Sequence, residues 1–309
     1  MEKQSTKYVY LLSLLLAAFI FLINLISDYI VVLTEPAYHI KILIYLIDAL
    51  FLGTAISIGL FVINPTLSQA MATLRRMLRV ENLSNPLLSK LSSEAPGTYH
   101  HSLNVSTLAQ KAAKAIGADP LLVRTAAYYH DIGKLDNPFS FVENQSGGEV
   151  PTSEDSESIR KNARIIIAHV DKGAALAKKY DLPAEIIDMI REHHGTTRAL
   201  YFYRIAKEKG FKIKKTDFRY LGTIPQSRES AILMISDCVE AWTRAYPFLT
   251  KQRIKEIVSN TIDERLKENQ FRGANLTKSD LTKIARSLEE TLLAIYHHRI
   301  DYGAEAKEE

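Results

Sequence analysis

Five histidines and two aspartates fall on the apolar faces of predicted helices, and this pattern constrains the fold more than any other feature of the chain. They are His101, His130, Asp131, His169, His193, His194 and Asp237. Polar side chains on a helix of a globular protein normally face water, on the side opposite the apolar stripe. Burying imidazole and carboxylate groups without partners is energetically costly. We therefore expect a fold that brings these side chains together around a shared partner.

The helix that contains residue 101 illustrates how the faces are assigned. Four and seven residues after His101, the chain has Val105 and Leu108. The same count from the preceding residue, His100, gives Asn104 and Thr107 at the polar positions. Residues at these spacings share one face of a helix. We therefore expect His101 to face the interior and His100 to face water.

The other candidate ligands continue apolar stripes in the same way: His169 follows apolar residues 165–166, the His193-His194 doublet ends the stripe 186–190, and Asp237 follows apolar residues 233–234. A single histidine on an apolar face is more often a hydrogen-bonded core residue than a metal ligand. Seven such residues favour a metal site, because mixed imidazole and carboxylate ligands suit Mn, Fe, Co or Zn. In the His130-Asp131 doublet, the carboxylate is placed to bridge two ions.

Two long apolar stretches, residues 9–33 and 42–63, precede this series. Each is long enough to cross a hydrocarbon core of about 30 Å. They predict a two-helix transmembrane hairpin over residues 1–64. A cleaved signal peptide is the alternative for the first stretch, but its apolar run is long and no small-residue cleavage site follows it.

Basic residues flank the predicted hairpin on both sides. Lys3 and Lys7 precede the first span, and Arg75, Arg76 and Arg79 follow the second. Positively charged flanks are typical of the cytoplasmic side of a membrane. We therefore expect both ends of the hairpin, and the domain that follows it, to lie in the cytoplasm at the cell membrane.

The remaining chain divides into three parts. Residues 65–97 are expected to form a juxtamembrane connector, with an amphipathic stretch whose arginines contact anionic membrane lipid or, alternatively, pack against the main domain. Residues 98–303 form the main domain, which includes a loop at 144–158 and two helices near 250–266 and 277–300. Residues 304–309 are a charged tail that we expect to be disordered.

Composition limits the possible functions and fold classes. The chain shows no repeat and no strand-rich region, so the predicted fold class is all-α. A formal net charge of +4 over 309 residues does not indicate a nucleic acid polymer as partner. The single cysteine, Cys238, excludes an internal disulfide and is interpreted as a packing residue rather than a nucleophile. Small residues Ser57 and Gly59 leave a homodimer open.

The ordered motifs of the chain resemble those of the HD-domain phosphohydrolases, specifically the membrane-anchored PgpH-type phosphodiesterases that cleave cyclic di-AMP. These motifs are residues 94–102 (EAPGTYHHS), 130–134 (HDIGK), 141–145 (FVENQ), 166–173 (IIAHVDKG), 193–197 (HHGTT) and 237–240 (DCVE). A His-Asp doublet alone is a weak motif, but the ordered series with two adjacent histidines is specific. The resemblance implies an HD-domain helical bundle after the hairpin.

The resemblance also implies how the ligands are shared between two divalent ions, with Mn or Fe expected. One ion would take His101, His130, Asp131 and Asp237, and the other would take Asp131, His169, His193 and His194. Asp131 would bridge them. A hydroxide held by both ions would be the nucleophile. Lys134 would bind a phosphate oxygen, with a solvated surface lysine as an equal alternative. Phe141, Asn144 and Gln145 are candidates for contacts with a base or ribose.

The expected reaction is hydrolysis of cyclic di-AMP to linear pApA. Adenine specificity comes from the resemblance, since nothing in residue spacing distinguishes adenine from guanine. Related cyclic di-GMP enzymes carry a Gly-Tyr-Pro signature after the histidine pair, where this chain has Gly195-Thr196-Thr197. Two alternatives stay open: a phosphohydrolase for another nucleotide, such as an alarmone or a nucleoside phosphate, and a receptor that binds a nucleotide without cleaving it.

Overall fold

The computed structural model describes residues 22, 26, 38–63, 71, 79–145, 155–246 and 248–296. The chain forms two compact units, Met1–Arg75 and Arg76–Glu309. In the first unit, helix α2 (Tyr38–Ile63) contains the second predicted span. Among the described residues, no helix combines the length and hydropathy needed to cross a bilayer. The first predicted span lies outside the described residues apart from Leu22 and Ile26, so the transmembrane hairpin stays a prediction.

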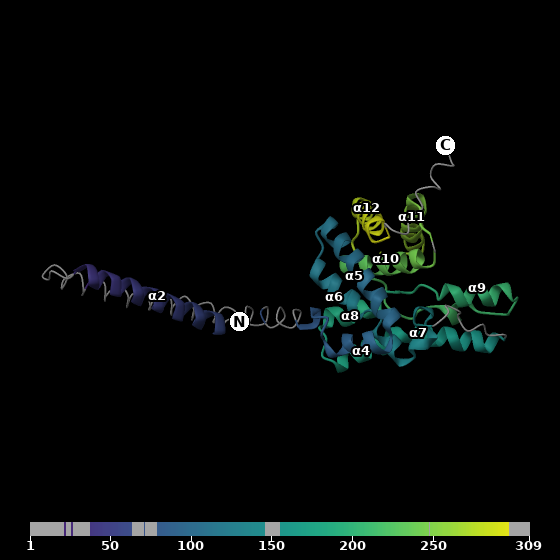
Figure 1. The fold of residues 1–309 in the computed structure, drawn as a ribbon, viewed down its shortest axis with the longest axis horizontal. Coiled ribbons are helices and arrows are strands. Elements are labelled where there is room, and N and C mark those ends of the chain that lie inside the picture. The colour runs from purple at the N-terminus through teal and green to yellow at the C-terminus, as the bar shows by residue number, and fades with distance from the viewer. Residues whose placement is uncertain are drawn as a thin grey trace, which may run out of the picture. The chain divides into compact units, whose positions relative to one another are not determined.

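The second unit is built from helices (Figure 1). Its α-helices are α4 (Pro86–Glu94), α5 (Pro96–Ile116), α6 (Pro120–Tyr129), α7 (Ser156–Lys179), α8 (Ala184–Glu192), α9 (Leu200–Glu208), α10 (Arg228–Arg244), α11 (Lys251–Lys267) and α12 (Lys278–Ile295), and its 3₁₀ helices are η1 (Ile132–Asp136), η2 (Pro138–Ser140), η3 (Val142–Asn144) and η4 (Lys215–Phe218). In the described part of the chain, extended pairing occurs as isolated bridges, such as the one between Arg198 and Arg219. The all-α prediction is confirmed for these residues.

Local sequence sets the helix boundaries. Proline occupies the first helical position of α4, α5 and α6, where the missing N–H costs no hydrogen bond. The Asp119 carboxylate caps α6 by accepting from the backbone N–H groups of Leu121 and Leu122. Helix α5 ends at Gly117, whose φ of 65° is left-handed. These signals fix the short α5–α6 connection.

Helix α5 is the central element of the core. It packs against α6, α10 and α12, and α11 packs against α10 and α12. The side chains of Val105, Leu108 and Ala112 are fully buried along α5. The predicted helices near 250–266 and 277–300 are thus present as α11 and α12, and they pack on helices that carry candidate ligands.

Helix α4 belongs to the core of the main domain, although the sequence predicts a connector over residues 65–97. Its side chains Leu87, Leu88 and Leu91 are fully buried in the same hydrophobic core as α5. The Tyr129 hydroxyl also donates to the Val80 carbonyl at 2.7 Å. The main domain therefore begins before residue 98, because the apolar face of α4 completes its core.

Candidate metal centre

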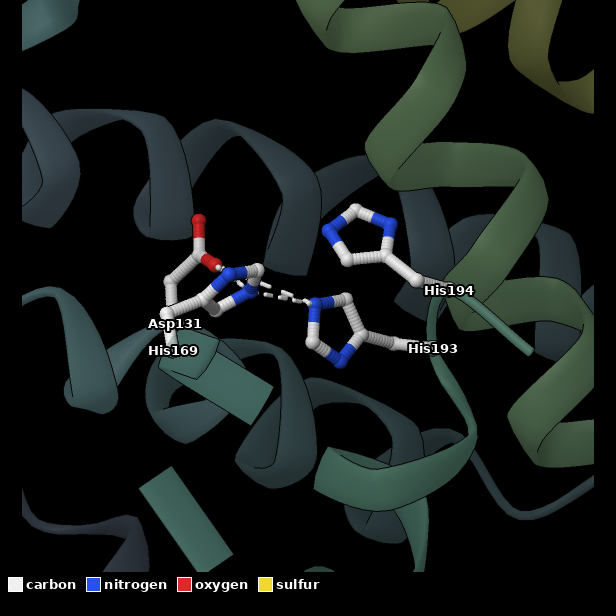
Figure 2. A group of neighbouring side chains, drawn as sticks. All are labelled: Asp131, His169, His193 and His194. Carbon is white, nitrogen blue, oxygen red and sulfur yellow. Dashed lines mark hydrogen bonds and ion pairs between the residues drawn. The ribbon is translucent and has the colours of Figure 1, made fainter. Parts of the chain in front are cut away.

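The structure brings all seven candidate ligands together in the second unit. They form two groups, Asp131 with His169, His193 and His194, and His101 with His130 and Asp237. Within each group, one ligand atom per residue lies within 4.8 Å of the others. Figure 2 shows the first group, in which the Asp131 carboxylate and the rings of His169 and His193 turn toward one another. His101 is buried and His100 is exposed, as the periodicity predicts.

Five separate elements supply these side chains. His101 lies on α5, His169 on α7 and Asp237 on α10. The His130-Asp131 doublet occupies the junction between α6 and η1, and His193 caps the C-terminus of α8. The chain turns away directly after the pair, because Gly195 has a left-handed φ of 53°. The prediction of a helix end at Gly195 is therefore close to the structure.

Three of the imidazoles are oriented by the same local contact. In each, the ring Nδ1 bonds to the carbonyl oxygen three residues earlier: His130 to Ala127 at 2.8 Å, His169 to Ile166 at 2.5 Å, and His193 to Ile190 at 2.7 Å. A carbonyl only accepts, so the imidazole proton is assigned to Nδ1. The Nε2 atom of each ring then points into the centre, the arrangement that metal-binding histidines adopt.

Several nitrogen and oxygen atoms in the centre have no hydrogen-bond donor opposite them. His169 Nε2 lies 3.2 Å from His193 Nε2, and both rings commit their Nδ1 protons elsewhere. The described residues also leave His130 Nε2 and Asp131 Oδ1 buried without a hydrogen-bond partner. Buried polar atoms are rarely left unpaired. Cations at this position would satisfy these lone pairs, so the residues fit a site for divalent metal ions.

His101 is held by a carboxylate that the sequence interpretation missed. Its Nδ1 contacts Glu240 Oε2, and Asn104 donates to Glu240 Oε1 at 3.2 Å. Its Nε2 lies 3.0 Å from Asp237 Oδ1 and 3.6 Å from Asp131 Oδ2. A carboxylate behind a ligating imidazole fixes the ring and raises its basicity. Glu240 follows Asp237 by three residues on α10, and this spacing was the available signal.

The pKa shifts of the histidines differ between the two ligand groups. Burial disfavours the charged form of His130, but the carboxylates of Asp131 and Asp237 outweigh it and raise its pKa to about 10. Burial and the positive charge of His130 lower the pKa of His193 to about 3. Burial and the charge of His193 hold the pKa of His194 well below its usual range. His193 and His194 are therefore neutral near pH 7, the form that ligates metals.

Lys134 is not a solvated surface lysine. Its Nζ lies 2.7 Å from Asp131 Oδ2 and 2.6 Å from Glu143 Oε1. The Thr98 hydroxyl donates to the same Glu143 oxygen at 3.2 Å. Burial disfavours the Glu143 carboxylate, but Lys134 outweighs it and lowers the pKa of Glu143 to about 2. Glu143, which the sequence interpretation did not assign, thus holds Lys134 beside the proposed bridging carboxylate.

The side-chain amides of Asn144 and Gln145, two of the candidates for base or ribose contacts, have hydrogen-bond partners within the protein. The Asn144 side chain accepts from the Thr98 backbone N–H at 3.1 Å and donates to the Pro138 carbonyl at 3.2 Å. Gln145 donates to the Phe139 carbonyl at 2.7 Å. Asn144 thus links η3 to both α5 and η2, and Gln145 bonds to η2; their contacts with a base or ribose stay a prediction. Of the predicted loop at 144–158, residues 146–154 lie outside the described residues.

A cavity of about 600 Å³ opens from the metal centre. Its wall includes His101, Asp131, His169, His194 and Asp237, together with Lys134 and Phe141. The Tyr220 ring, also part of the wall, stacks on His194 with centroids 4.2 Å apart. Cys238 lines the same cavity, and Arg265 donates to its sulfur at 3.5 Å. Five of the seven candidate metal ligands therefore line a cavity with room for a bound molecule of several rings.

Comparisons with known proteins agree with this site. The HD domain family model matches residues 98–242. The cyclic-di-AMP phosphodiesterase PgpH of Bacillus subtilis is 40% identical over 257 residues, which are 83% of this chain and 36% of the relative. PgpH of Listeria monocytogenes is 43% identical over 230 residues, which are 74% of this chain and 32% of the relative. This chain therefore spans about a third of these curated relatives.

A solved structure gives the same result in three dimensions. The crystal structure of the L. monocytogenes phosphodiesterase PgpH HD domain in complex with cyclic-di-AMP is 43% identical, with a TM-score of 0.66. The alignment covers 70% of this chain and 100% of that one. The likeness includes sequence and fold over the entire solved domain.

Proposed function

This chain belongs to the PgpH-type HD-domain family, and we propose from that premise that it hydrolyses cyclic di-AMP to linear pApA. The observation that carries the proposal is the pair of ligand groups on either side of Asp131. Asp131 Oδ2 lies 3.2 Å from His130 Nε2, and its Oδ1 lies 3.1 Å from His169 Nε2. Such a site serves the hydrolysis of phosphodiesters, in which charge develops on both the attacking and the leaving oxygen. Adenine specificity is supported by the two curated relatives and by the ligand of the solved domain.

Two divalent cations are proposed at the centre, one held by His101, His130 and Asp237, the other by His169, His193 and His194, with Asp131 shared. Mn or Fe suits this mixture of imidazole nitrogen and carboxylate oxygen. When bound, the cations supply a water molecule of lowered pKa and positive charge against the phosphate. Glu240 orients the His101 ring, and backbone carbonyls of α6, α7 and α8 orient the rings of His130, His169 and His193.

The protein side chains orient the substrate rather than attack it. Lys134 lines the cavity with its ammonium beside Asp131, so it is placed to pair with a non-bridging phosphate oxygen. Cys238 is the single thiol of the chain, and burial raises its pKa, which disfavours the thiolate that a nucleophile requires. The proposed mechanism therefore uses no covalent intermediate with the protein.

The test is product analysis with the full chain loaded with Mn and incubated in parallel with cyclic di-AMP and cyclic di-GMP. We expect pApA to accumulate and little product from the guanine compound. Cleavage of neither compound by a chain that contains two metals would contradict the proposal. That result would favour a phosphohydrolase for another nucleotide, such as an alarmone or a nucleoside phosphate.

We also propose that residues 1–64 anchor the chain in the cell membrane with the catalytic domain in the cytoplasm. The support is the two apolar stretches and the basic residues that flank them. Extraction of membranes with alkaline carbonate should leave the chain in the membrane pellet. Recovery in the soluble fraction would contradict the anchor.

A further inference from the structure

The cavity continues beyond the metal centre as a groove between α9 and α10. Both helices contribute side chains at helical spacing. Leu200, Tyr201 and Arg204 come from α9, and Asp237, Ala241 and Trp242 come from α10. Residues separated by one, four and five positions lie on one face of a helix. Each helix therefore presents a continuous face to the groove.

Along α10, this face runs from a candidate metal ligand to an aromatic ring. Asp237 belongs to the metal centre, and Trp242 follows it by five residues, which corresponds to about 7.5 Å along the helix axis. Between them, Ala241 gives the floor of the groove only a methyl group. The distal part of the groove is therefore open from the centre up to the indole ring.

Trp242 is not used in the hydrophobic core. Its side chain is 36% exposed, and it lies outside the buried clusters of the described residues. The Arg204 guanidinium lies over the ring, 6.0 Å from its centroid. Tryptophan is a strong platform for cations and for planar aromatic ligands. An indole and a guanidinium at the end of an open groove match the π-face of a nucleobase.

We propose that Trp242 and Arg204 form a purine-stacking subsite, which takes a nucleobase of the dinucleotide whose phosphate occupies the metal centre. This inference rests on the proposed function, because it uses a substrate with a base attached one sugar away from the scissile phosphate. The subsite favours dinucleotides over simple phosphodiesters. It adds binding energy at a distance from the reacting atoms and does not take part in the chemistry.

The kinetic test uses the full chain loaded with Mn. Base stacking is worth about 1–3 kcal/mol by alanine substitution, so Trp242→Ala should lower kcat/KM for cyclic di-AMP by about 5- to 150-fold, mainly through KM. Trp242→Phe keeps a π-face and should stay within about threefold of the unmodified chain. Phe248→Ala removes another exposed ring, 71% accessible and absent from the cavity wall, and should have no effect.

A second substrate separates stacking from damage to the metal centre. In bis(p-nitrophenyl) phosphate, the rings are joined to the phosphate without a ribose, and neither ring is a nucleobase. Trp242→Ala should therefore leave its hydrolysis unchanged. Equal losses on both substrates would make Trp242 a structural residue and overturn the subsite. Unchanged kinetics on cyclic di-AMP would overturn it as well.

Tryptophan fluorescence measures binding at the subsite without turnover, because Trp242 is the single tryptophan of the chain. In the metal-free full chain, cyclic di-AMP should quench the emission saturably. If the unmodified chain fails to cleave cyclic di-AMP, the proposed function fails, but a titration with AMP still tests the subsite. Quenching by AMP would support the subsite, and unchanged emission at saturating AMP would overturn it.

Discussion

At the residue scale, the metal centre depends on contacts behind the ligands as much as on the ligands themselves. Three imidazoles are turned by carbonyls of their own helices, which the sequence supplies wherever a histidine ends a helical stripe. His101 differs, because its ring is fixed by Glu240 from α10. The backbone carbonyls are local to each helix, whereas the contact of Glu240 with His101 requires the packing of α5 against α10.

This difference gives a prediction for Glu240. Replacing Glu240 by Gln should weaken metal binding by about 10- to 100-fold, as loss of such an outer partner typically does. The measurement is a metal titration of the full chain, with Glu185→Gln, an exposed change on α8, as the matched control. Equal affinities in both variants would show that Glu240 does not support the site.

At the element scale, the site depends on how closely η1 approaches α7. A Cβ built on Gly133 would lie 1.9 Å from the His169 carbonyl oxygen and 2.5 Å from the Gly173 backbone nitrogen. Only a residue without a side chain permits this crossing, which brings Asp131 within 3.1 Å of His169 Nε2. Backbone contacts of this kind do not yield without moving the element.

Gly133→Ala should therefore push η1 from α7 and separate Asp131 from His169. We expect turnover of cyclic di-AMP to fall by more than about 100-fold, since an error of about 1 Å at a reacting centre already costs that much. The variant should retain helical circular dichroism, because the core around α5 is untouched. Activity near that of the unmodified chain would contradict the role of the η1–α7 crossing.

The helix faces could be predicted from the sequence, but the contacts made by the 3₁₀ helices could not. Period-3.6 patterns identified the faces of α5, α7, α8 and α10, and with them the inward direction of His101, His169 and Asp237. The Lys134–Glu143 pair could not be foreseen, because it joins η1 to η3 across short 3₁₀ turns that have no apolar period. The partners of Asn144 could not be foreseen for the same reason, since they depend on how η2 folds back.

At the scale of the whole molecule, the main domain begins earlier in the chain than residue 98, the start predicted from the sequence. Helix α4 belongs to the core although its residues precede the matched HD region at 98–242. The apolar face of α4 resembles that of any amphipathic connector, so periodicity alone does not show what it packs against. Contacts between distant segments decide the boundary.

The position of α4 can be tested through stability. Leu88→Ala should lower the free energy of unfolding by about 2–5 kcal/mol, because it leaves a cavity in a fully buried site. Leu83→Ala, at a side chain 42% exposed, should change it by less than about 0.5 kcal/mol. Denaturation of the full chain, followed by the emission of Trp242 in the same unit, measures both. Equal small changes would place α4 outside the core.

The proposed chemistry depends on two metal ions that share Asp131, and the metal content of the purified chain shows whether both ions bind. Elemental analysis of the full chain, purified in the presence of Mn, should find two ions per chain, while Asp131→Ala should lose both and also lose turnover. His100→Ala changes the neighbouring, exposed histidine and should retain two ions. One ion or none in the unmodified chain, or equal loss in both variants, would contradict the shared centre.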